Sequence, residues 1–473
     1  MSPDIEERLS QVDDLPRALE AIKVLVECVK FLEKENAQLK EKIARLEKNS
    51  STSSKPPSSD IVKPPQAQRQ RGVRKCGGQA GHKGSCRSKL KPDIIEPVHL
   101  ESCPRCGCSE LGKEDPKNVK FHQQAELVVK PVKVTQYNLH GRYCACCKRV
   151  RYPSLPAGVI QGHVFGPRLL SLCGYIKATI GASVSNITEL FVDVFELPVS
   201  RGTIQNAIFR VSDSLQEPYD EALESLRKEK SLNVDETGWK ENGKRFWVWL
   251  FCTPLIACFV IRPSRGSLVL KEILGEVFGG AITSDFYSAY VCYATAIQQF
   301  CLAHFIRDLK FLTTLSQDVS RIFGEKLLDY MKLIFALWHK RQDLTPEQFQ
   351  NETSCLEASL KSYVFAQEFP KGSHARRIQS RMIKHWDSMF RFLKQPDLLD
   401  PTNNTAEQAL RLLVHLRRIS QGSRSLAGRL WTARAATVVV SCRKQQRSTW
   451  TFMQQAISSH FFNTSSPSLM PGN

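Results

Sequence analysis

The chain contains 473 residues, and its 66 Lys and Arg against 47 Asp and Glu give a formal net charge of +19. At roughly 100–200 residues per domain this length allows two to four domains, and a hydrophobic share of 42% excludes a wholly disordered or fibrous chain. The strongest apolar run, residues 246–261, contains Thr253-Pro254 and is shorter than the ~20 residues of a membrane-spanning helix. The polar N-terminus MSPDIEERLS lacks a secretory signal. We therefore expect a soluble, cytoplasmic, basic protein with no membrane partner.

Residues 1–48 carry the heptad pattern of a leucine zipper. The a positions hold Ile22, Val29, Asn36 and Ile43, and the d positions hold Leu25, Leu32, Leu39 and Leu46. β-Branched residues at a with Leu at d favour a parallel two-stranded coiled coil, and one Asn at a fixes its register. The pattern predicts a homodimer or higher oligomer. The alternative is an amphipathic helix that packs on its own chain.

Residues 49–98 read as a flexible basic linker. They begin with NSSTSSKPPSSD and continue into a Pro-, Gly- and Arg-rich stretch that contains GGQAGHKG, a composition that cannot bury a core. Positions 61–91 hold nine Lys or Arg and no acid, and nine more basic residues without an acid follow Glu407. Such stretches favour a polyanion, most simply double-stranded DNA, because neutralised phosphates release counterions. The alternative is a role in solubility alone.

Residues 99–155 predict a zinc-ribbon domain. Two CxxC turns, separated by strand-like sequence at 127–143, supply the four thiolates that tetrahedral Zn²⁺ prefers. The four cysteines are Cys103, Cys106, Cys144 and Cys147. Cys108 and Cys146 are rival ligands that spacing does not exclude. Disulfides are not expected in a cytosolic chain, so the alternative is free thiols.

Residues 160–228 read as a helical region resembling a helix-turn-helix. Ser185 or Asn186 caps one helix that runs to Phe195, a Leu-Pro-Val turn at 197–199 breaks it, and Ser200 caps the next helix. The second helix of such a pair can enter the major groove of DNA. The residues expected to face DNA are Arg201, Thr203, Gln205 and Asn206. Plain helical packing is an equally good interpretation.

Residues 229–447 have the order of a ribonuclease-H-like α/β core. Short strand patterns occur at 231–235, 246–252 and 256–262, a helical pattern follows at 267–274, and another strand pattern lies at 281–285. Sequence 298–309 then reads as a strand that passes into a helix. In this fold the first and fourth strands are adjacent. Acids at the ends of those two strands therefore converge.

Three acids are the candidate catalytic residues: Asp235 and Asp285 at strand ends, and Glu407 on a helix that begins near Asn404. Two-metal phosphoryl transfer needs carboxylates that hold two Mg²⁺ ions about 3.5–4 Å apart. Each acid has an alternative role. Asp235 and Asp285 could end strands in turns, and Glu236 could replace Asp235. Glu407 could belong only to a capping box with Asn404.

The stretch between Asp285 and Glu407 is longer than the core requires. Its helical periodicity, for example at 326–341, predicts an inserted helical subdomain at about 309–395. Cys301 and His304 open this stretch as a CxxH sequence, which offers only two metal ligands and is better explained by packing or by shaping the site. A C-terminal helix and polar tail are expected at 448–473.

Several long, co-linear runs carry a family resemblance. They are SSKPPSSD with GGQAGHKG, the double CxxC, HVFGPRL, VDETGW, SDFYSAY, QQFCLAHFIRDL, and NNTAEQALR followed by RRISQGSRS. With these runs the chain resembles transposases of the insertion sequence 66 family, which belong to bacterial mobile elements and use an Asp-Asp-Glu active site. One departure is that Leu412 follows Arg411 where such proteins often have an Arg-Pro pair. This leaves the DNA contacts after Glu407 open.

The resemblance implies that Asp235, Asp285 and Glu407 are the catalytic acids and bind two Mg²⁺ ions, for which Mn²⁺ could substitute. It also implies that the four cysteines of the two CxxC turns bind structural Zn²⁺ and that the core is ribonuclease-H-like with a helical insertion. Accessory proteins of the element are expected partners, and the protein would associate with the bacterial nucleoid.

The expected reaction has two steps. Water attacks a phosphodiester at the end of the element and frees a 3′-hydroxyl, which then attacks target DNA in line, so no covalent protein–DNA intermediate is needed. Phosphates near the site would be held by Arg411, Arg417, Arg418 and Arg424. Two rival functions remain: a catalytically silent DNA-binding regulator derived from a transposase, and a ribonuclease or structure-specific nuclease on the same core.

Overall fold

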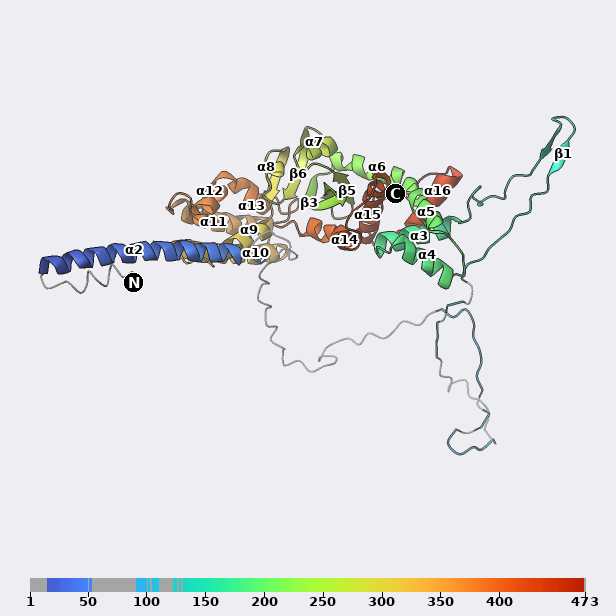
Figure 1. Ribbon diagram of the computed structural model, residues 1–473, viewed down its shortest axis with the longest axis horizontal. Helices are drawn as coiled ribbons and strands as arrows, with labels where there is room; N and C mark the ends of the chain where they lie inside the picture. Colours follow the sequence, from blue (N-terminus) through green and yellow to red (C-terminus); the bar gives the residue numbers. More distant parts are fainter. Residues whose placement is uncertain are drawn as a thin grey trace. The chain divides into compact units, whose positions relative to one another are not determined.

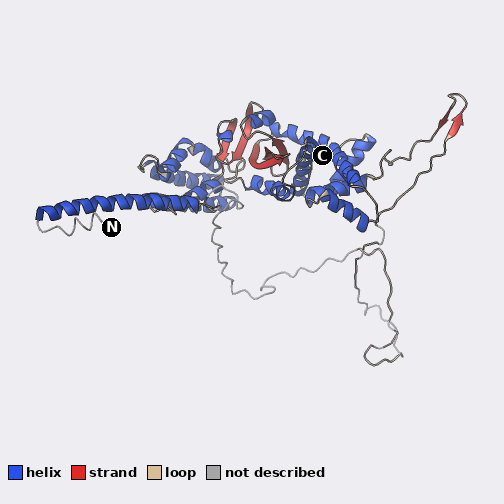
Figure 2. Ribbon diagram, viewed as in Figure 1, coloured by secondary structure: helices blue, strands red, loops and turns tan. Residues whose placement is uncertain are grey.

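The computed structural model describes residues 15–49, 51–52, 91–99, 101–102, 104–109, 122–125, 127–128 and 131–471. By its contacts the chain divides into two compact units, one comprising residues 1–64, 138–189 and 199–473 and the other comprising residues 65–137 and 190–198. The architecture is mixed α/β, with helices around a central sheet (Figure 1, Figure 2). Among the described helices none is long and apolar enough to cross a membrane.

The central sheet has five strands in the spatial order β5-β4-β3-β6-β7. They are β3 (Ser231–Glu241), β4 (Lys244–Cys252), β5 (Ala257–Arg262), β6 (Val277–Ser284) and β7 (Ala294–Phe300). The first three strands pair antiparallel, whereas β6 pairs parallel with both β3 and β7. Asn242 and Gly243 join β3 to β4 with φ of 46° and 78°, the two positive values that a tight type I′ turn requires. The first and fourth strands are adjacent, as the sequence predicted.

Helices cover both faces of this sheet. α6 (Gln216–Ser225), α14 (Asn404–Ser420) and α15 (Leu426–Lys444) pack on the face that carries Trp239, Leu250 and Phe259. On the other face, Trp249 of β4 meets Tyr290 of α8 (Ser288–Val291) edge to face, with ring centroids 5.9 Å apart. The short helices α7 (Leu268–Leu274) and η3 (Leu226–Lys228) contact β6. Burial of both faces explains why β4 and β5 read as continuous apolar runs.

Helices fill the long stretch between β7 and α14. They are α9 (Leu302–Leu312), α10 (Asp318–Lys340), η4 (Arg341–Asp343), α11 (Pro346–Phe365), α12 (His374–Lys384) and α13 (Trp386–Lys394). Their apolar faces form a core of their own that is continuous with Phe300 at the end of β7. The buried Gln299 of β7 donates to the Met389 carbonyl and accepts from the Phe392 amide of α13. The insertion is therefore fixed to the edge of the sheet beside the candidate site.

The remaining helices include α2 (Leu15–Leu46), α3 (Pro167–Thr179), α4 (Val184–Asp193), α5 (Arg201–Ser214) and α16 (Thr449–Phe462). α3, α5, α15 and α16 pack against one another. Arg434 of α15 is buried there, and its guanidinium donates to the Ser212 carbonyl, the Ser212 hydroxyl and the Gln216 side chain. Arg434, one of the nine basic residues after Glu407, is therefore bound inside the protein and is not available to contact a polyanion.

The long helix α2 leaves its heptad stripe uncovered. Ile22, Val29, Leu32, Leu39 and Ile43 are all more than half exposed. A different face of the same helix meets the insertion, where Glu41 lies 3.2 Å from His374 and Ala44 packs on the helical core. Leu46 is exposed as well, whereas Leu25 is half-buried. Most of the a and d side chains therefore lack cover from the described residues.

Several boundaries differ from the sequence prediction. β3 runs on to Glu241, so Asp235 lies in the middle of a long strand and not at the end of a short one. α4 ends at Asp193 and not at Phe195, and its first turn is capped by Ser183, whose hydroxyl accepts from the Asn186 amide. The prediction of strand across 127–143 was wrong for most of its length, because residues 131–141 are irregular and only β1 (Arg142–Cys144) and β2 (Arg149–Arg151) pair.

Candidate active site

Asp235 lies on the face of β3 that meets α14. Side chains alternate along a strand, and its neighbours on this face contact the segment around α14: Asn233 donates to the Asn403 side chain, and Arg417 donates to Thr237. Burial is the main reason that the pKa of Asp235 is raised well above its ordinary value, and the nearby charges of Glu236, Asp285 and Glu407 add to the effect. The carboxyl is therefore poorly solvated and lies close to other acids.

Asp285 follows the last residue of β6, the strand next to β3. Its Oδ1 accepts the Tyr287 amide at 2.9 Å, which fixes the carboxyl at the mouth of the turn. Burial first, and then the charge of Glu236, raises the pKa of Asp285 to about 6, while the Tyr287 amide and Arg265 act in the opposite direction. Glu407 contributes to the raised value as well.

Glu407 lies in the first turn of α14, and its amide donates to the Asn403 carbonyl at 3.1 Å. Asn403 and not Asn404 is the N-cap, and it makes no side-chain capping bond, so the capping-box alternative for Glu407 is wrong. One carboxylate oxygen lies 3.6 Å from His304 Nδ1, and the other lies 3.9 Å from Arg307 Nη2. Glu407 therefore faces α9 as well as the sheet.

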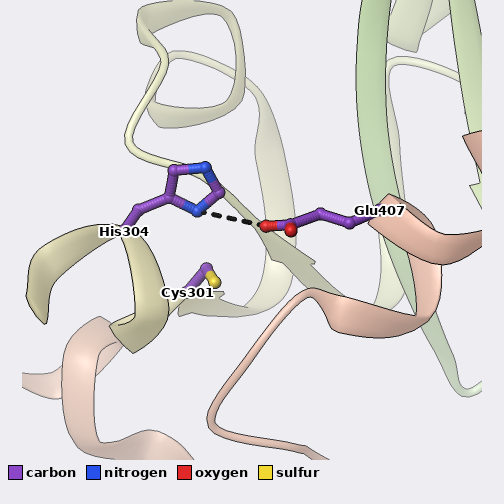
Figure 3. Close-up of side chains that lie close together, drawn as sticks. All are labelled: Cys301, His304 and Glu407. Carbon is purple, nitrogen blue, oxygen red and sulfur yellow. Dashed lines mark ion pairs between the residues drawn. The ribbon is translucent and has the colours of Figure 1, made fainter. Parts of the chain in front are cut away.

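The three predicted acids lie near one another, since the charges of Asp285 and Glu407 raise the pKa of Asp235, and the charge of Glu407 also raises the pKa of Asp285. They do not form a tight cluster in the part of the chain that the structure describes. There, the one group of three metal-binding side chains whose ligand atoms all lie within 4.8 Å of one another is Cys301, His304 and Glu407 (Figure 3). Sequence reasoning placed Cys301 and His304 in packing or in shaping the site, without a third ligand.

Glu236 points to the opposite face of β3 from Asp235 and has full partners there. Its Oε1 accepts from Arg265 at 2.6 Å, and its Oε2 accepts from the Tyr290 hydroxyl. Arg265 in turn lies over the Tyr287 ring, 3.9 Å from its centroid. The alternative in which Glu236 replaces Asp235 is therefore disfavoured, because both oxygens of Glu236 are already bound to Arg265 and Tyr290 on the opposite face of the sheet.

Cys301 occupies the turn between β7 and α9. Its amide donates to the Ser284 carbonyl beside Asp285, and its Sγ accepts the Asn403 amide at 3.1 Å. Burial raises the pKa of this thiol, although the amides of Asn403, His304 and Ala303 counteract the increase by donating to the sulfur. Burial also lowers the pKa of His304, although the charge of Glu407 acts in the opposite direction.

Asn403 joins all these elements and was missed as a functional residue by sequence reasoning. It is 1% exposed. Its side chain donates to the Val234 carbonyl at 2.8 Å and accepts from Asn233, and its amide reaches Cys301. The doubled Asn of the NNTAEQALR run was the available signal, but only the fold shows that the first of the pair is the buried one.

The predicted DNA-contacting residues lie on two helices and one loop. On α5, Arg201 and Asn206 are exposed, whereas Thr203 and Gln205 are half-buried and Ser200 caps the helix by accepting the Thr203 amide.

Among the arginines around the end of α14, Arg411, Arg418 and Arg424 are exposed. Arg417 instead donates to the Thr237 hydroxyl and the Gly238 carbonyl of β3. Arg417 is therefore half-buried and bonded to the sheet, unlike the other three.

The predicted zinc ligands are described in part. Cys103 lies outside the described residues. Cys106 is exposed. Cys144 ends β1, and hydrogen bonds from the backbone and side chains of Cys147 and Cys146 lower the pKa of its thiol. Amides that point at a sulfur in this way suit a thiolate ligand. These hydrogen bonds do not show whether Cys147 or the rival Cys146 is the fourth ligand.

Comparison with known families decides what kind of enzyme carries this site. A model of the Transposase IS66 family matches residues 162–429, more than half of the chain. The chain belongs to the IS66 family of transposases. A Family of unknown function (DUF6444) matches residues 7–88. No curated protein matches the chain.

Membership of the IS66 family makes the chain a DNA-processing enzyme of transposition. The IS66 match contains Asp235, Asp285 and Glu407 as well as Cys301 and His304. It begins after the predicted zinc ribbon and after α2, so those segments lie outside the matched residues.

Proposed function

We propose that the chain is a DDE transposase that cleaves DNA at the 3′ ends of an insertion sequence and joins those ends to target DNA. The observation that supports this proposal is that Asp285 and Glu407 both raise the pKa of Asp235, and that the turn after β6, the turn after β7 and the start of α14 are joined by hydrogen bonds through Cys301 and Asn403. The strand order β5-β4-β3-β6-β7, with one parallel neighbour of β3, supports a ribonuclease-H-like core.

The acids fit divalent cations. Two buried carboxyl groups whose pKa values are raised by burial and by like charges are stabilised when a cation is present. Asp235, Asp285 and Glu407 would hold the metal, and two Mg²⁺ ions, or Mn²⁺ in their place, would activate the attacking oxygen and stabilise the leaving oxygen. Carboxylate oxygens are the ligands that Mg²⁺ prefers.

The chain's own residues prepare the site. Asn403 fixes the start of α14 to the backbone of β3, and this bond holds Glu407 of α14 in position relative to Asp235 of β3. The Tyr287 amide orients Asp285. Arg411, Arg418 and Arg424 would contact DNA phosphates, and we keep Arg417 as a weaker candidate because its guanidinium is bound to β3.

We further propose roles for the flanking segments. The exposed heptad stripe of α2 supports a homodimer through this helix, because a row of apolar side chains at a and d is the contact surface of a coiled coil. α5 would enter the major groove with Arg201, Thr203, Gln205 and Asn206. A structural Zn²⁺ would bind Cys103, Cys106, Cys144 and Cys147, and accessory proteins of the element would join the complex.

The decisive experiment replaces Asp285 by Asn in the full chain. We expect this variant to bind DNA that carries the element's ends but to lose Mg²⁺-dependent nicking and strand transfer, because a neutral amide is a poor ligand for the cation. The matched control is Glu276→Gln, which removes an exposed acid on the approach to β6. Normal nicking by Asp285→Asn would refute the assignment. Shifts without nicks in the unmodified chain would indicate a regulator, and nicks without strand transfer would indicate a nuclease.

A further inference from the structure

The turn between β7 and α9 has the local form of half a metal site. Cys301 precedes α9 and His304 lies in its first turn, so a single short segment presents a sulfur and an imidazole to the same side (Figure 3). The Cys301 sulfur also accepts backbone amides of its own turn and of Asn403. Cys144 in the β1–β2 hairpin has the same kind of amide bonding. Amides that donate to a sulfur favour the thiolate, although burial raises the pKa of Cys301 against their effect.

Glu407 of α14 completes a set of three ligands. His304 Nδ1 and Glu407 Oε1 face each other at 3.6 Å, both atoms are buried, and neither has a hydrogen-bond partner. That separation is too long for a hydrogen bond. The second oxygen of Glu407 faces Arg307 at 3.9 Å, so the first oxygen remains available to a cation. A bridging ion would satisfy both of these buried polar atoms at once.

The distances suit a tetrahedral ion. Zn²⁺ bonds to nitrogen and oxygen of about 2.0–2.2 Å place two tetrahedral ligands roughly 3.4 Å apart. The observed 3.6 Å between His304 and Glu407 is close to this value, and all three ligand atoms lie within 4.8 Å of one another. A sulfur, a nitrogen and an oxygen donor together favour Zn²⁺ and similar transition metals over Mg²⁺, which prefers oxygen.

We propose that Cys301, His304 and Glu407 form a site for one Zn²⁺-class ion, and that Zn²⁺ bound there withdraws Glu407 from the magnesium site. Binding of the ion follows from the geometry alone, whereas the withdrawal of Glu407 rests on the proposed function. If Glu407 Oε1 coordinates Zn²⁺ beside α9, only Oε2 remains, and that oxygen faces Arg307, so Zn²⁺ there competes with Mg²⁺ for this carboxylate. Zn²⁺ would then inhibit DNA cleavage by occupying this set of ligands.

The binding test counts metal in the full chain. Purified protein is dialysed against Zn²⁺ and then against metal-free buffer, and bound zinc per chain is measured by mass spectrometry. We expect Cys301→Ser/His304→Ala to hold one zinc fewer than the unmodified chain, and Glu407→Gln to bind that zinc at least tenfold more weakly in calorimetric titration. The matched control, Cys292→Ser/His339→Ala, removes an exposed cysteine and an exposed histidine elsewhere and should keep the full count.

Equal zinc content in all four proteins would overturn the site. Thermal unfolding of each variant shows whether it is folded, and Glu407→Gln, which changes one carboxylate oxygen to an amide, decides the question if the double variant unfolds. A zinc at the predicted ribbon is present in all four proteins and cancels in the comparison.

The inhibition test measures nicking in Mg²⁺ with and without added Zn²⁺. We expect the Zn²⁺ concentration that halves the rate to be at least tenfold higher for Cys301→Ser/His304→Ala than for the unmodified chain, each compared with its own zinc-free rate. Equal sensitivity would overturn the withdrawal of Glu407. If no protein nicks DNA, the proposed function fails, whereas the zinc count still decides the site.

Discussion

The two cysteine turns at Cys144 and Cys301 are alike locally but differ in what surrounds them. Each sulfur accepts backbone amides from its own turn. The turn at Cys144 lies in an exposed two-stranded hairpin, whereas Cys301 is fully buried and is bonded to Asn403, far away in the sequence. A short motif can therefore supply two ligands, but the tertiary contacts decide whether a third ligand is present and whether the turn supports a catalytic site.

The largest change in stability is expected at Asn403, whose buried side chain links β3 to the start of α14. Asn403→Ala removes two side-chain hydrogen bonds and leaves the Val234 carbonyl unsatisfied. We expect it to lower the free energy of unfolding by about 3 kcal/mol, measured by urea denaturation. The neighbouring Asn404→Ala, at an exposed helix position, should cost less than ~1 kcal/mol. Equal losses in both variants would show that Asn403 does not join the elements of the site.

A second comparison separates Arg417 from Arg418. Arg417→Met breaks the bonds to Thr237 and Gly238, and we expect a loss of about 2 kcal/mol in the free energy of unfolding, because hydrogen bonds from charged donors are stronger than neutral ones. Arg418→Met at an exposed position should leave stability unchanged within ~0.5 kcal/mol and weaken DNA binding. A stability loss in Arg418→Met alone would reverse these roles.

The raised pKa of Asp285 predicts a pH dependence of stability in the metal-free chain. The folded pKa is about 6, whereas the ordinary value is 3.8. The folded state therefore holds the proton more tightly, and its contribution to stability is complete below pH 3.8 and is lost as the pH rises through about 6. We expect the free energy of unfolding to fall by about 1 kcal/mol from pH 5 to pH 7 through this group. Asp285→Asn should remove this part of the slope, and an unchanged slope would contradict the assignment.

The smallest effect concerns the exposed turn itself. After zinc is removed with a chelator, the lowered pKa of Cys144 should make it react with iodoacetamide at a lower pH than an ordinary thiol does. Cys301 should stay unlabelled until the chain unfolds, because it is buried. Mass spectrometry of digested protein after short pulses checks both sites. Early labelling of Cys301 would show that the junction opens without unfolding, and Cys144→Ser should change core stability by less than ~0.5 kcal/mol.

Much of the sheet was predictable from local sequence. Apolar runs bounded by turns located the five strands, and the helical periodicity located the insertion, because burial imposes these patterns on neighbouring residues. The motif around Glu407 placed it near the start of a helix, and α14 begins at Asn404. The heptads of α2 also predicted a helix, and most of the a and d side chains that the structure describes on it are exposed.

The tertiary structure decided the roles of residues whose partners are distant. Glu236 and Asp235 are neighbours in sequence, yet the alternation of β3 sends one to Arg265 and the other to the face of α14. Arg417 and Arg418 look equivalent in the sequence, but only Arg417 is bonded to β3. Glu407 comes close to Cys301 and His304 only because α14 lies beside α9. Local sequence patterns reflect whether a residue is buried or exposed to solvent. Contacts between residues far apart in the sequence depend on how the helices and strands pack together.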